Sequence, residues 1–110
     1  MEFNDLEINL ENKLKEQVIL QDFLEHDYSD ILNFNKDWNK LLEVVEKIES
    51  IRHQKYGRFI VTIAEDTCLI RSTNITKNDI YSKLYVSKNN KIGAVYESCL
   101  LFVKFWNNLK

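Results

Sequence analysis

The spacing of apolar residues changes twice along this chain, and these changes limit the folds that are open to it. In residues 35–50 they recur three and four positions apart, as on one face of a helix. In residues 58–64 they alternate at every second position, as in a strand with one buried face. From residue 91 the helical spacing returns. The chain is therefore predicted to form an α+β domain.

Three segments carry strand patterns, namely RFIVTIA (58–64), TCLIRS (67–72) and DIYSKLYVS (79–87). Only the polar pair Glu65-Asp66 separates the first two, so a hairpin is predicted there. The short connections favour an antiparallel sheet of three consecutive strands.

Two helices are predicted to flank these strands. The first spans residues 35–50 with Asn35 as its N-cap, and its apolar stripe is Trp38, Leu41, Leu42, Val45 and Ile48. The last begins at Lys91, and its stripe is Ile92, Val95, Tyr96, Cys99, Phe102, Val103 and Trp106. The predicted core is thus helix, three strands, helix over residues 34–110.

Residues 1–33 form a predicted helical extension that packs on this core. Between positions 5 and 25 apolar residues recur at i, i+4, and these are Leu6, Leu10, Leu14 and Val18. The same start alternates like a short strand over Leu6, Ile8 and Leu10. We favour the helix.

The charges are unevenly distributed along the chain. Residues 1–51 carry thirteen acids and five lysines, a net charge of −8, whereas residues 52–110 carry ten bases and four acids, a net charge of +6. Either the two halves pack together and complement each other's fields, or the basic half presents an anion-binding surface.

Three segments resemble a known family. They are DWNKLLEVVEKIE (37–49), KIGAVYE (91–97) and FVKFWN (102–107), and their order and spacing are similar to those of the phage ABA sandwich domain, found in small proteins of bacterial viruses and prophages. The resemblance covers about residues 34–109. Asn39, Lys40 and Gly93 depart from the family pattern. The resemblance implies the fold and a viral gene acting in the cytoplasm of a bacterial host, and it implies no activity.

The sequence predicts no enzyme, metal or cofactor. His26 and His53 lie in predicted connections without a nucleophile motif nearby. Cys68 and Cys99 lie in apolar runs without metal-ligand spacing, so both are predicted to be reduced packing residues. The acidic start lacks the apolar segment of a secretion signal, and no apolar run is as long as a membrane span, so we expect a cytoplasmic protein.

One predicted site lies on the outer face of the third strand. Aromatic rings beside cations can stack on a base and neutralise its phosphate, and the candidate residues are Tyr81, Lys83, Tyr85, Arg71 and Arg58. This site would suit a protein that sequesters an anionic nucleotide as a counter-defence. The alternative is that the tyrosines only reflect the preference of tyrosine for strands.

A second apolar row on the last helix is a candidate interface. Leu101, Phe105 and Leu109 lie off the main stripe and would be covered by the N-terminal segment or by a homodimer partner. The leading prediction is therefore a binding protein that contacts a host or viral protein. The element order is also that of double-stranded RNA-binding domains, but the net negative charge argues against nucleic-acid binding.

Overall fold

The computed structural model describes residues 2–25, 34–74 and 83–109. Its elements follow the order α1 (Glu2–Leu24), α2 (Trp38–Ser50), β1 (Phe59–Ala64), β2 (Thr67–Ser72), β3 (Lys83–Ser87) and α3 (Lys91–Leu109). The predicted α+β class is confirmed, with one helix before and one helix after the three consecutive strands in the sequence and an additional N-terminal helix.

The sheet is antiparallel in the order β1-β2-β3. Residues 65–66 join β1 to β2 as predicted, with Ala64 paired to Thr67 across the turn. Glu65 has a φ of 52°, the left-handed conformation that such tight hairpins use. β3 begins at Lys83, and the earlier part of the predicted third strand, 79–82, lies outside the described residues.

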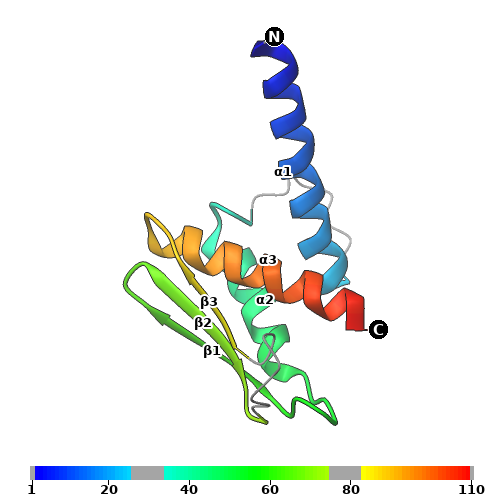
Figure 1. Cartoon of the computed structure of the whole chain (residues 1–110), viewed down its shortest axis with the longest axis vertical. Helices are drawn as coiled ribbons and strands as arrows, with labels where there is room; N and C mark the ends of the chain where they lie inside the picture. The colour runs from blue at the N-terminus through cyan, green and yellow to red at the C-terminus, as the bar shows by residue number, and fades with distance from the viewer. Residues whose placement is uncertain (1, 26–33, 75–82, 110) are drawn as a thin grey trace.

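All three helices lie on one side of the sheet (Figure 1). α3 packs against β2 and β3, and α2 packs against β1. α1 packs against α3 and α2, so it forms a further layer beyond them. The N-terminal half of α1 stands clear of the other elements in Figure 1. The core therefore lies between the sheet and the helices, and no helix of the described residues covers the other face of the sheet.

The core is rich in aromatic rings. Phe59 of β1 and Phe102 of α3 meet edge to face with ring centroids 4.8 Å apart. Phe102 also stacks on Trp106 at 6.3 Å and meets Phe23 of α1 at 6.4 Å. Such pairs add to the free energy of burying the rings. Elements from both ends of the chain are thus joined in one hydrophobic cluster.

α2 begins later than predicted. Its N-cap is Asp37 and not Asn35, because a carboxylate oxygen of Asp37 accepts from the backbone N–H groups of Asn39 at 3.0 Å and Lys40 at 3.4 Å. Trp38 packs against the core but is only partly buried. The predicted stripe is wrong at one member, because Leu42 is 41% exposed.

Val44 takes the place of Leu42 on the buried face of α2 and is 0% exposed. Leu42 and Val44 are both apolar and lie on different sides of the helix. The sequence pattern alone therefore does not decide which of the two faces the core. The contact of α2 with β1 and α3 decides it.

α1 is helical as predicted, but its buried face is different. Leu14 and Val18 are 59% and 43% exposed, whereas Leu20, Phe23 and Leu24 are buried. The side chains of Leu6 and Leu10 lie outside the described part of the structure. Because the C-terminal half of the helix packs on α3, the residues that face α3 there set the buried side.

Candidate binding surfaces

The face of the sheet turned away from the helices is built by three cross-strand rows, and the row of Ala64, Thr67 and Ser87 lies at the end with the hairpin turn. Paired residues of neighbouring strands point to the same side of a sheet. We call the surface of the other two rows the open face, and its members are Ile60, Arg71 and Lys83 in one row and Thr62, Leu69 and Tyr85 in the next.

The open face is accessible to solvent. Tyr85 is 63% exposed, Thr62 is exposed, and Leu69 and Arg71 are half-buried. Ile70 of β2 lies on the opposite side of the sheet, facing the helices, and is only 1% exposed. Tyrosine and arginine are enriched among the residues that carry most of the binding energy in protein interfaces, and both occur on this face.

The register brings several of the predicted ligand residues together. Arg71 pairs with Lys83, and Tyr85 lies two residues further along β3 on the same face. Arg58 is exposed just before β1, where its backbone N–H donates to the Thr73 hydroxyl at 2.9 Å. Tyr81 and the side chain of Lys83 lie outside the described part of the chain.

The predicted interface row on α3 does not form one exposed surface. Leu101 and Leu109 are 39% and 37% exposed, but Phe105 is only 6% exposed. The Phe105 ring meets that of Tyr56 edge to face at 5.4 Å. Phe105 is therefore a core residue, because the loop before β1 folds Tyr56 beneath it.

The N-terminal helix α1 packs on the side of α3 that carries Tyr96. The Tyr96 hydroxyl donates to the Glu16 carboxylate at 3.1 Å. Burial and this carboxylate raise the pKa of Tyr96. Tyr96 belongs to the main stripe of α3, so this contact leaves open what covers the row of Leu101, Phe105 and Leu109.

A pocket lies where the C-terminal ends of the three helices meet. Its volume is about 550 Å³, within the range of sites for small ligands. We call it the helix-end pocket, and its lining residues are Asp22, Phe23, Glu25, Lys47, Ile51, Trp106 and Asn107. These residues come from segments far apart in the sequence, so no local motif could have predicted the pocket.

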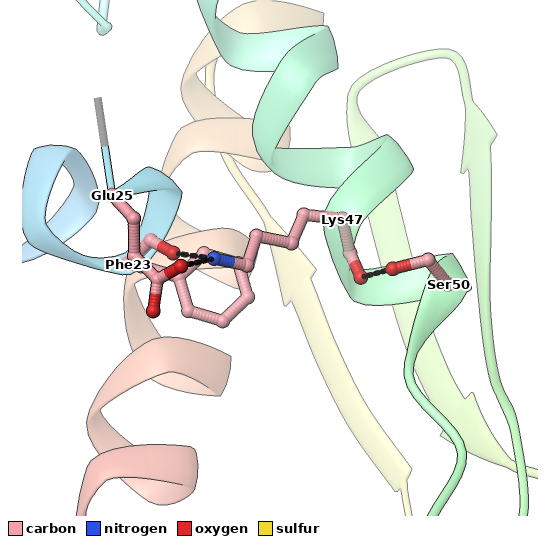
Figure 2. A network of polar contacts seen from close by, with 4 residues as sticks. All are labelled: Phe23, Glu25, Lys47 and Ser50. Atoms are coloured by element: carbon pink, nitrogen blue, oxygen red, sulfur yellow. Dashed lines mark hydrogen bonds and ion pairs between the residues drawn. The ribbon is translucent and has the colours of Figure 1, made fainter.

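Lys47 closes one wall of this pocket and fastens α1 to α2 (Figure 2). Its ammonium group donates to the backbone carbonyl of Phe23 and lies 3.7 Å from the Glu25 carboxylate. It also lies 5.0 Å from the centre of the Phe23 ring, within cation–π range. Glu25 has a φ of 59°, the conformation that often ends a helix. Lys47 thus caps the C-terminus of α1 from a neighbouring helix.

The remaining polar candidates have structural roles. Nδ1 of His53 accepts from the backbone N–H of Lys55 at 3.1 Å, which shapes the loop before β1. Burial raises the pKa of both the Cys68 and Cys99 thiols, which disfavours the reactive thiolate. His26 lies outside the described residues. Over residues 2–25, 34–74 and 83–109, no group of three potential metal-ligating side chains is found.

No helix within the described ranges is long and apolar enough to span a membrane. Comparison with known proteins gives no match, whether to family models, to curated proteins or to solved structures.

Proposed function

We propose that this protein is a non-enzymatic binding protein that contacts a partner protein through the open face of its sheet. The observation that carries the proposal is the cross-strand row of Thr62, Leu69 and Tyr85, in which a 63% exposed tyrosine adjoins a half-buried leucine. A partner that covers this row would remove apolar surface from water, which is the main favourable term in protein association.

The charges beside this row define the partner further. Arg71 and Lys83 form the neighbouring row, and Arg58 lies two residues before Ile60 of that row. A partner with an apolar patch and an acidic rim would complement this surface and would be steered to it over a distance. The resemblance to proteins of bacterial viruses favours a host or viral protein in the bacterial cytoplasm as this partner.

Matched charge reversals test the proposal. A protein captured from bacterial lysate with the wild-type chain is purified, and its affinity is measured for wild type, Arg71→Glu and Lys104→Glu. Lys104 is exposed on α3, on the helical side of the sheet. The proposal expects Arg71→Glu to weaken binding at least about tenfold, or about 1.4 kcal/mol, and Lys104→Glu to leave it unchanged. Equal effects of the two reversals would refute the open face as the contact surface.

A second candidate function is the sequestration of an anionic nucleotide. The strand register pairs Arg71 with Lys83 and places Arg71 on the same face as Tyr85, which favours this function because an aromatic ring near a cation can bind a base and its phosphate. Thermal unfolding with a panel of mono-, di- and cyclic nucleotides tests this function. A ligand at 100 times its dissociation constant adds about 2.7 kcal/mol of stability, and Arg71→Gln should abolish the shift. A panel without any shift rejects this candidate.

A further inference from the structure

The helix-end pocket combines three features that together specify a ligand. The first feature is that its walls lie at the C-terminal ends of three helices. These helices are α1, α2 and α3, whose last residues are Leu24, Ser50 and Leu109. The aligned peptide dipoles of a helix leave a partial negative charge of about half an electron at this end. Cationic groups are therefore favoured in the pocket.

The second feature is that two of these helix ends already hold a cation. Lys47 donates to the Phe23 carbonyl at the end of α1 (Figure 2). The Arg52 guanidinium donates at 3.0 Å to the carbonyls of Glu49 and Ile51 at the end of α2. α3 has no basic residue in its last turn, although Trp106 and Asn107 of that turn line the pocket. Lys110, which follows α3 directly, lies outside the described residues, so within the described residues the last turn of α3 has no cation of its own.

The third feature is the composition of the lining. Asp22 and Glu25 supply two carboxylates, against the single ammonium group of Lys47. Trp106 and Ile51 supply an apolar wall, and an indole attracts cations through its ring face. A ligand that carries a cation on an aliphatic stem matches both kinds of wall, because its stem can lie on apolar surface while its head meets the carboxylates.

We propose that the helix-end pocket binds an alkyl cation, a primary ammonium or guanidinium group on an aliphatic stem. The head would lie between Asp22, Glu25 and the end of α3, with the stem against Trp106. This site is separate from the open face and does not depend on the function proposed for it. The same chemistry is offered by a lysine or arginine side chain of a peptide and by a free small amine, and the experiment below distinguishes these two sources.

The test uses Trp106 as a reporter. In a Trp38→Phe variant Trp106 is the only tryptophan, because the chain contains two. Its fluorescence is followed during titration with agmatine and with a capped Gly-Arg-Gly peptide, each paired with a neutral control. The controls are butylurea for the amine and the citrulline peptide for the arginine peptide. The proposal expects a saturable change with a cation, at least about tenfold weaker for its neutral control.

Variants locate the site. Asp22→Asn with Glu25→Gln should weaken cation binding about tenfold, and Glu46→Gln on the exposed side of α2 should not change it. Tighter binding of agmatine would indicate a free amine as the natural ligand, and tighter binding of the peptide would indicate a side chain of a partner.

The proposal fails if the neutral controls bind as tightly as the cations, or if neither cation saturates by about 10 mM, well above the millimolar dissociation constants of weak small ligands. Both comparisons use a chain with intact carboxylates, so they hold even where the carboxylate variants fold poorly. Equal binding by the folded carboxylate variant and the Glu46→Gln control would also overturn it.

Discussion

Lys47 illustrates how one residue joins two elements. It caps α1 from α2, and its stem and ammonium group lie near the Phe23 ring. Its ion pair with Glu25 adds little, because Glu25 is 80% exposed and such surface pairs are strongly screened. The hydrogen bond to the Phe23 carbonyl is the stronger contact, since charged donors form the stronger hydrogen bonds.

Lys47→Met should therefore lower the free energy of unfolding by about 1–2 kcal/mol, as expected for a lost charged hydrogen bond whose stem volume is retained. Urea unfolding measures this change. Lys104→Met is the matched control, because Lys104 is exposed on α3 and should change stability by less than about 0.5 kcal/mol. Equal losses in both variants would show that the Lys47 cap does not stabilise the fold.

Phe105 and Leu101 test the corrected assignment of α3. Phe105→Ala should lower the free energy of unfolding by about 3–5 kcal/mol because it leaves a cavity beside Tyr56. Leu101→Ala should change it by less than about 1 kcal/mol, since Leu101 is 39% exposed. Urea unfolding of the two variants gives both values, and a small loss for Phe105→Ala would contradict its place in the core.

The raised pKa values of Cys68, Cys99 and Tyr96 predict the pH dependence of stability. In the unfolded chain thiols ionise near pH 8.5 and tyrosine near pH 10, whereas the raised pKa values keep a larger fraction of the native groups protonated there. The unfolded state then binds fewer protons than the native state, so stability falls as pH rises above about 8.5.

Urea midpoints at about pH 8 and about pH 10.5 should show this fall. The fall should be smaller in a Cys68→Ala, Cys99→Ala variant, because two of the three groups are then absent. A midpoint in the wild-type chain that stays constant or rises over this interval would contradict the burial of these groups.

The strands were predictable as elements because their signal is local. The alternation in residues 67–72 reappears as strict alternation of buried and half-buried residues along β2. The same alternation placed Arg71 and Tyr85 on the face away from the core. Helix faces were harder to predict, because α1 and α3 are apolar on more than one side. Tertiary contacts decided that Leu20 and Phe105 are buried while Leu14 is exposed.

Gln17 attaches α1 to the segment that precedes α2. Its side-chain oxygen accepts from the Phe34 backbone N–H at 2.8 Å, and its amide group donates to Asn35 at 3.0 Å. Gln17→Ala would leave the buried Phe34 N–H without this acceptor, so unfolding should become easier by about 1–3 kcal/mol. Thermal or urea unfolding measures it, with Val18→Ala on the exposed side as the control. A loss no larger than that of Val18→Ala would argue against this attachment.

At the scale of the whole molecule, the helices leave two surfaces for ligands. The open face lies on the side of the sheet without helices, and its residues follow from the strand register. The helix-end pocket depends on the meeting of three helix ends, including Asp22 and Trp106, which are distant in sequence. The first surface could therefore be predicted from alternation, and the second required the tertiary arrangement.

The central claim, that a partner protein docks on the open face, is tested most directly by site-specific photo-crosslinking in bacterial cells. A photoreactive phenylalanine derivative replaces Tyr85 or Thr62 on the open face, or Lys104 or Glu46 on the helical side. Docking on the open face predicts one discrete covalent adduct from the two open-face positions, lost when Arg71→Glu is added, and none from the helical positions. Adducts of equal yield from all four positions, or from the helical positions alone, would contradict it.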